Sequence, residues 1–234
     1  MQKTNYEKAL CIAAVVSFIL FALLGSIHFW CFNESFYTSE HNKLTLYGKS
    51  IADHIGISDE DLKDLTHFTL SYLNDPDASL EREMIIKGEL REVFTDDEKL
   101  HMEDVRDLNL IANRLILISA VIFIASMILI VIRKYSFSLL FDTYRRVLVY
   151  ISVFLGVVGS WILIDFDSFW TFFHHIFFAG NDLWLLDLRK DVLIMIVPPD
   201  FFNHLVITIV VTFVVLLVIA YMVLRSLSRK GEAR

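Results

Sequence analysis

Cysteine, proline and glycine are scarce in this chain of 234 residues, which contains two, three and eight of them. The two cysteines, Cys11 and Cys31, lie 20 residues apart in one apolar segment. A helix rises about 1.5 Å per residue and would separate them by roughly 30 Å, so they cannot pair with each other. We therefore expect the protein to be built without an internal disulfide. The chain also has no internal repeat, no low-complexity tract and no linker rich in glycine or proline.

Motifs for several common chemistries are missing as well. The sequence has no HExxH or CxxC that would indicate a zinc site, and no GxSxG that would indicate a serine hydrolase. It has no Walker A motif, no glycine-rich dinucleotide loop and no basic patch apart from the flanks of its apolar segments, which argues against phosphate and nucleic-acid chemistry. The sequence thus predicts no metal, no cofactor and no nucleic-acid partner.

Hydrophobic residues make up 56% of the chain and aromatic residues 14%, which is too apolar for an ordinary soluble fold. Four segments approach the ~20 apolar residues that cross a hydrocarbon core. They are residues 9–30, 110–132, 147–164 and 205–224. The first is too long for a cleaved signal peptide, so we expect it to be retained. Ionisable residues are almost absent from these segments, which argues against an ion or proton pathway.

Lysine and arginine gather on one set of flanks. They are Lys3, Lys8, Arg133, Lys134, Arg145, Arg146, Arg225, Arg229, Lys230 and Arg234. The other two connecting segments are acidic, since residues 33–108 carry 19 Asp or Glu against 8 Lys or Arg, and residues 165–204 carry 6 against 2. By the positive-inside rule both termini are expected in the cytoplasm and both acidic segments outside.

The predicted fold class is an all-α polytopic membrane protein with four transmembrane helices, a small helical extracytoplasmic domain and an interfacial aromatic helix. Residues 1–32 are expected to form the cytoplasmic N-terminus and the first transmembrane helix, and residues 33–108 the acidic helical domain. The remaining expected parts are transmembrane helices at 109–132 and 147–164, a cytoplasmic basic loop at 133–146, an aromatic outer loop at 165–204, and a last transmembrane helix with a cytoplasmic tail at 205–234.

Helix signals organise the first outer segment. Apolar residues recur at helical spacing at Leu44, Tyr47, Ile51 and Ile55. Gly56 then ends this pattern. A second helix is predicted to begin after Ser58, which can form a capping box with Asp61, and to end before Pro76.

A third outer helix is predicted to begin at a capping box of Thr95 and Glu98. No glycine or proline occurs between residues 89 and 155, so this helix can continue into the second apolar segment. It would hold His101 about 10 residues, or roughly 15 Å, above the apolar stretch. Asp104 follows three residues later, near enough on a helix to orient the imidazole and raise its basicity.

The second outer segment is unusually aromatic, and two histidines lie within it. An aromatic stripe at helical spacing is formed by Phe166, Phe169, Trp170, Phe173 and Phe177. This stripe predicts a helix that lies at the level of the lipid headgroups. At 100° per residue, His174 lies on the flank of the stripe and His175 on the opposite face. His174 is therefore the better candidate for a sheltered base with a tuned pKa.

The order of these parts resembles a known family. One membrane helix precedes an acidic domain that ends in FTDDEKLHMEDV at residues 94–105, and two more helices precede FHHIFFAGNDLWLLDLRKDVLIMIVPPDFF at residues 173–202. The chain in this respect is similar to the lipoprotein intramolecular transacylases, called Lit, of Gram-positive bacteria. One departure is Leu188, where a proline would be expected after "LD".

The resemblance implies an acyltransferase of the cell membrane. Such enzymes move the sn-2 acyl chain of a diacylglyceryl-modified lipoprotein to the α-amino group of its own N-terminal cysteine, giving the lyso-form lipoprotein. The family's paired histidines would fall on His101 and His174, as acid and base without an acyl-enzyme, and His175 would occupy a variable position. Its substrate partners would be diacylglyceryl lipoproteins within membrane lipid. Apart from the resemblance, we expect the protein to be a monomer.

The resemblance also implies supporting residues around the substrate. They are Asp104, Asn181, Trp184, Asp187 and Asp191. Taken without the resemblance, Trp184 is interpreted as an interfacial anchor, and Asn181, Asp187 and Asp191 as turn or cap residues.

Two other function classes stay open at this point. One is a non-catalytic membrane scaffold or sensor whose acidic outer domain binds a partner. The other is a metal-dependent membrane hydrolase, in which His101, His174 and His175 with carboxylates would bind zinc, although their spacing matches no zinc motif.

Overall fold

The structure is a computed structural model that describes the backbone of residues 2–232 and the side chains of residues 5–230. The chain divides into two compact units. The first unit is Met1–His28, Ala112–Ile164 and Thr208–Arg234, and the second is Phe29–Ile111 and Asp165–Ile207.

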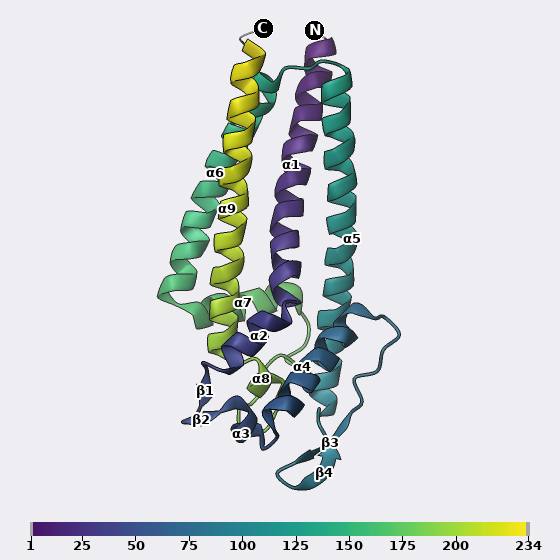
Figure 1. The fold of residues 1–234 in the computed structure, drawn as a ribbon, viewed down its shortest axis with the longest axis vertical. Helices are drawn as coiled ribbons and strands as arrows, with labels where there is room; N and C mark the ends of the chain where they lie inside the picture. Colours follow the sequence, from purple (N-terminus) through teal and green to yellow (C-terminus); the bar gives the residue numbers. More distant parts are fainter. Residues whose placement is uncertain (1, 233–234) are drawn as a thin grey trace. The chain divides into compact units, whose positions relative to one another are not determined.

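The first unit consists mainly of four long helices. They are α1 (Gln2–Cys31), α5 (Asp96–Ile132), α6 (Phe137–Ile164) and α9 (Pro199–Glu232). Each is long and apolar enough to cross a membrane, which confirms the four predicted spans. In Figure 1 the first turns of α1 and the last turns of α9 lie at the same end of this bundle. Apolar side chains fill its interior, and the hydroxyl of Tyr144 donates a hydrogen bond to the Leu217 carbonyl oxygen at 2.7 Å.

The connection between α5 and α6 is shorter than the predicted basic loop at 133–146. Helix α6 already begins at Phe137, ten residues before the apolar stretch on which the expected span was based. Ser136 caps the N-terminus of α6, because its hydroxyl accepts a hydrogen bond from the backbone N–H of Leu139 at 3.4 Å. A helix can begin in polar sequence, so hydropathy located the apolar core of this span and missed its first turns.

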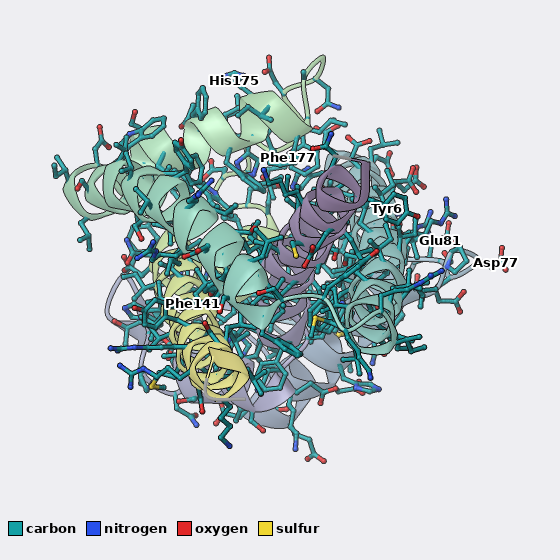
Figure 2. All side chains as sticks on the ribbon, turned by 90° about the horizontal axis from the view of Figure 1, so that it is seen from above. Tyr6, Asp77, Glu81, Phe141, His175 and Phe177 are labelled. Carbon is teal, nitrogen blue, oxygen red and sulfur yellow. The ribbon has the colours of Figure 1, made fainter. Side chains whose placement is uncertain are left out.

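The second unit is built from shorter elements, together with the ends of α5 and α9. Its helices are α2 (Glu34–His41), α3 (Ile51–Ile55), α4 (Asp59–Asn74), α7 (Phe166–Phe177) and α8 (Val192–Ile196). Two antiparallel hairpins accompany them, β1 (Thr45–Leu46) with β2 (Lys49–Ser50) and β3 (Glu83–Ile86) with β4 (Glu89–Glu92). The core of this unit joins apolar side chains of α3 and α4 to those of α8. Asp77 and Glu81, labelled in Figure 2, are exposed residues of the segment between α4 and β3.

The hairpins were not predicted, and one of them overturns part of the helical pattern read between Leu44 and Ile55. Tyr47 and Gly48 form its turn with φ values of 51° and 79°. Two successive residues in the left-handed region match the twist of a tight hairpin, so the chain folds back here before the helix begins. Only Ile51–Ile55 is helical, and Gly56 ends it with φ 90° as predicted.

The two predicted capping boxes are present and explain where helices α4 and α5 start. Ser58 accepts from the Asp61 N–H and the Asp61 carboxylate accepts from the Ser58 N–H, which begins α4. Thr95 and Glu98 make the same exchange before α5. Helix α5 then runs unbroken to Ile132, as the absence of glycine and proline predicts. Eight of its first 13 residues are charged, so this part lies before the apolar stretch.

Candidate active site

Helix α5 holds His101 in the second turn after its cap. The imidazole is 7% exposed, and its Nδ1 is buried without a hydrogen-bond partner among the described side chains. Met102 beside it belongs to the hydrophobic core of the second unit. The helix therefore presents a polar ring to an apolar interior, which is uncommon unless the ring has a function or a bound partner.

Helix α7 holds His174 through its own backbone. Asp165 caps this helix by accepting a hydrogen bond from the Ser168 N–H at 3.0 Å. One turn before the histidine, the Trp170 carbonyl oxygen lies 2.8 Å from His174 Nδ1. A carbonyl oxygen can only accept, so Nδ1 carries the hydrogen, and in the neutral ring Nε2 keeps a free lone pair. His174 is thus fixed as a tautomer with a basic Nε2.

The second unit brings these two histidines together. Their ring centroids lie 6.1 Å apart with the planes inclined by 31°. Phe178 closes one side of the pair, at 5.1 Å from the ring of His101 and 5.5 Å from that of His174. His174 is 6% exposed, whereas the neighbouring His175, labelled in Figure 2, is exposed. The predicted difference between the two neighbouring histidines is therefore seen in their burial.

Both imidazoles are neutral at physiological pH. The pKa of His101 is lowered to about 4, mainly by burial and secondly by the charge that a protonated His174 would carry. The negative charge of Asp104 raises this pKa, but by a smaller amount. Burial also lowers the pKa of His174, opposed by the hydrogen bond to Trp170 and assisted by His175. A charge on His174 disfavours a charge on His101, so the pair accepts one proton rather than two. Such a pair can receive and return a single proton.

Asp104 acts on His101 through its charge and not through the expected contact. Its Oδ2 accepts a hydrogen bond from Asn181 Nδ2 at 3.0 Å, which ties α5 to the segment after α7. Asn181 Oδ1 in turn accepts from the Leu183 N–H at 3.2 Å and shapes the turn before Trp184. Asp104 and Asn181 therefore hold the chain that passes beside the histidines.

Trp184 lies directly on His174. Its ring stacks on His174 at 4.7 Å with an angle of 29°, and meets His175 edge-on at 5.4 Å. The indole Nε1 is buried and has no hydrogen-bond partner among residues 5–230. The structure thus places Trp184 beside His174, whereas Asp187 lies exposed and caps a turn through the Arg189 N–H.

Asp191 and Glu98 form the polar support beneath this segment. Asp191 is 7% exposed and accepts a hydrogen bond from the Asp187 N–H at 2.7 Å, so it closes the turn that leads to α8. Glu98 is fully buried, and its carboxylate oxygens accept from the N–H groups of Thr95 and Leu193, each at 2.6 Å. Burial raises the pKa of Glu98, although these hydrogen bonds oppose that shift.

Sequence reasoning recognised Glu98 as a helix cap and missed that it also binds the backbone of α8. Its spacing from Thr95 is a local signal, whereas the contact with Leu193 depends on the tertiary fold. Among the side chains at positions 5–230, no group of three or more His, Cys, Asp or Glu is arranged to hold a metal ion.

The low pKa of His101 can be measured in the folded protein. An NMR titration of ring-labelled histidines in detergent micelles should give a midpoint near pH 4, assigned by comparison with His101→Gln. His174→Ala should raise this midpoint and Asp104→Asn should lower it further, because the two neighbours act with opposite signs. The unfolded ring titrates near 6.5, so folding stability should fall as the pH drops from 6.5 towards 4. A midpoint at or above 6.5 would contradict the burial described here.

The chain was compared with known proteins by sequence and by structure. The family model described as lipoprotein intramolecular transacylase Lit matches residues 12–202. Comparison with curated proteins gave no match.

Among solved structures, the membrane-integral lipoprotein intramolecular transacylase Lit from Bacillus cereus has a TM-score of 0.78 at 18% identity, covering 99% of this chain and 100% of the other. Two variants of that protein, each with one histidine replaced, by alanine or by arginine, have TM-scores of 0.75 and 0.73 at 18% and 17% identity. They cover 99% of this chain and 98% and 96% of theirs. At this identity the likeness establishes a shared fold, while the match of the family model over most of the chain establishes the family. The chain belongs to the lipoprotein intramolecular transacylases, Lit.

Proposed function

We propose that this acyltransferase moves the sn-2 acyl chain of a diacylglyceryl-modified lipoprotein to the α-amino group of its N-terminal cysteine, with His101 and His174 as the catalytic pair. The observation that carries the proposal is the meeting of two buried imidazoles with lowered pKa values. The family indicates a lipoprotein substrate, and the paired rings offer a base for the proton transfer and a second group to bind the leaving oxygen.

The reaction converts an ester to an amide. The free α-amino group has a pKa near 8, so it must lose a proton before it can act as a nucleophile. The amine nitrogen attacks the ester carbonyl carbon, and the N–C bond forms while the carbonyl π electrons move to oxygen. The bond from this carbon to the glycerol C2 oxygen then breaks, and that oxygen takes up the proton released by the amine.

His174 is assigned as the base in this sequence. Its Nδ1–H is committed to the Trp170 carbonyl, which leaves Nε2 to take the proton from the attacking amine and deliver it to the leaving oxygen. His101 binds and orients the glycerol oxygen as it leaves. Both reacting groups belong to one substrate molecule, so proximity contributes to the rate and a protein nucleophile is unnecessary.

The surface of α7 suits a substrate held in a membrane. His174 faces inward, while Phe172, Ile176 and Phe177 on the same helix are each at least 50% exposed. A helix with an apolar exposed face lies in the interfacial region of a bilayer. We infer that this face lies in the outer leaflet, with the acidic segments outside the cell, both termini in the cytoplasm and the enzyme working as a monomer.

Mass spectrometry of N-terminal lipopeptides tests the proposal. The protein is expressed in a Gram-positive host that lacks its own N-acylating activity. The expected product has the same mass as the diacylglyceryl peptide and keeps one acyl chain after mild alkaline hydrolysis, because an amide survives conditions that cleave esters. The unreacted peptide loses both chains under the same treatment.

The alternatives give different products in this experiment. A hydrolase would yield a peptide lighter by one acyl chain, and loss of that product on addition of a chelator would indicate a metal. A scaffold or sensor would leave the diacylglyceryl peptide unchanged. Either result from a well-expressed wild-type protein would overturn the transacylation proposal.

A further inference from the structure

One polar group beside the histidine pair has no hydrogen-bond partner in the part of the chain that the structure describes. It is the indole N–H of Trp184, whose Nε1 is buried. Buried donors are nearly always paired, and an unpaired one in a folded protein calls for a bound molecule or a function. The other unpaired atom of this site is His101 Nδ1, so the two unpaired groups both neighbour His174.

The position of Trp184 is set by contacts that leave the N–H free. Its ring stacks on His174 at 4.7 Å, and the turn before it is held by Asn181, whose amide is bound to Asp104. Neither contact uses the indole N–H. These contacts therefore fix the position of the indole N–H and leave it available to donate a hydrogen bond.

The chemistry of this donor limits what it can do. An indole N–H donates a hydrogen bond and accepts none, and unlike imidazole it exchanges no proton in the physiological range. It cannot replace either histidine as an acid or a base. What it can supply is a fixed hydrogen bond to an oxygen atom, in an apolar setting where such a bond is strengthened.

We propose that the Trp184 indole N–H donates a hydrogen bond to the acyl carbonyl oxygen and stabilises the oxyanion formed during transfer. This inference rests on the proposed function and names a catalytic residue for the same site. When the amine nitrogen attacks the carbonyl carbon, the π electrons move to the carbonyl oxygen, which becomes negatively charged. The indole keeps its proton throughout, and the charge returns to form the C=O bond as the glycerol C2 oxygen leaves.

The stacking of Trp184 on His174 allows the proposed hydrogen-bond donor and the proposed base to act together. A base that removes the amine proton and a donor that binds the carbonyl oxygen must act on the same tetrahedral carbon. Because the rings of His174 and Trp184 lie 4.7 Å apart, the imidazole can reach the amine nitrogen while the indole N–H reaches the carbonyl oxygen of the same tetrahedral carbon. Trp184 would therefore contribute mainly to the transition state, because the hydrogen bond strengthens as the carbonyl oxygen gains charge.

The test removes the N–H and keeps the ring. Trp184→benzothienylalanine replaces the donor by sulfur in a bicycle of the same shape, and Trp184→Phe is a second variant that retains an aromatic stack. The kinetics of purified enzyme are followed with a synthetic diacylglyceryl lipopeptide in detergent micelles. We expect kcat to fall roughly 10²–10³-fold with KM nearly unchanged, as for the loss of one oxyanion donor.

Trp30 provides the matched control. It is the same residue type, lies at the end of α1, and packs on Phe29 and Phe36. The same replacements at Trp30 should leave kcat at the wild-type level. Thermal unfolding of every variant identifies any that is misfolded, and the benzothienylalanine variant keeps the test valid if the phenylalanine variant is unstable.

Three outcomes can be separated. A large loss of kcat in both folded Trp184 variants supports the inference. Wild-type kcat in these variants, with an active wild-type enzyme, overturns it and leaves the N–H as the donor to a structural water only. If the wild-type enzyme makes no amide from this substrate, the proposed function fails instead.

Discussion

Replacing His174, the proposed base, or His101, which orients the leaving oxygen, should reduce acyl transfer by roughly 10²–10⁴-fold, the usual contribution of a positioned catalytic group. His174→Asn is the sharper variant, because its amide N–H can still donate to the Trp170 carbonyl while the basic Nε2 is lost. His101→Gln keeps a polar side chain of similar length where the imidazole is buried. The rates are measured from the appearance of the alkali-resistant lipopeptide in the mass spectrometric assay.

His175→Ala is the matched control for this prediction. It removes the same residue type one position along the same helix, from the exposed face. We expect it to keep at least half of the wild-type rate. Equal losses in His174→Asn and His175→Ala would show that α7 had been disturbed generally, and undiminished transfer in His101→Gln or His174→Asn would remove that residue from the mechanism.

Replacing Glu98 should have the largest effect on stability among the polar residues of the site. Glu98→Ala leaves the N–H groups of Thr95 and Leu193 without the carboxylate that binds both. Hydrogen bonds to charged groups contribute about 1.5–3 kcal/mol each, and the relief of burying a charge offsets part of this loss. We expect a net destabilisation of about 2–4 kcal/mol, seen as a fall of roughly 5–15 °C in the midpoint of thermal unfolding.

Glu103→Ala controls for the general effect of removing an acidic residue from α5. Glu103 is exposed on the same helix and should change the midpoint by no more than about 2 °C, as is usual for surface substitutions. The two variants can be compared by circular dichroism in the same detergent. A midpoint for Glu98→Ala that matches Glu103→Ala would show that the buried carboxylate contributes no net stability.

Local signals account for the parts of the fold that were predicted well. Apolar runs identified the four spans because a bilayer demands about 20 consecutive apolar residues. Capping boxes located the starts of α4 and α5 because both partners of each box lie within four residues of sequence. The burial of His174 and the exposure of His175 followed from helical periodicity alone.

The errors arose where local signals were ambiguous or competed. The spacing of apolar residues from Leu44 to Ile55 fits a helix, but the left-handed turn at Tyr47 and Gly48 folds the first half into a hairpin. Helix α6 starts before its apolar stretch because hydrogen bonding, and not hydropathy, determines where a helix begins. Asp104 has the spacing to bind His101 on a helix, yet Asn181 takes its carboxylate.

The sequence by itself determined that this chain spans a membrane four times and that the candidate residues His101 and His174 lie on two separate helices, because periodicity, capping and hydropathy act between near neighbours. Only the tertiary structure decided that His101 and His174 meet, that Trp184 stacks on His174, and that Glu98 binds the backbone of α8. These contacts join residues far apart in the chain. They depend on how whole helices pack, and burial then lowers the pKa values that make two neutral imidazoles available for chemistry.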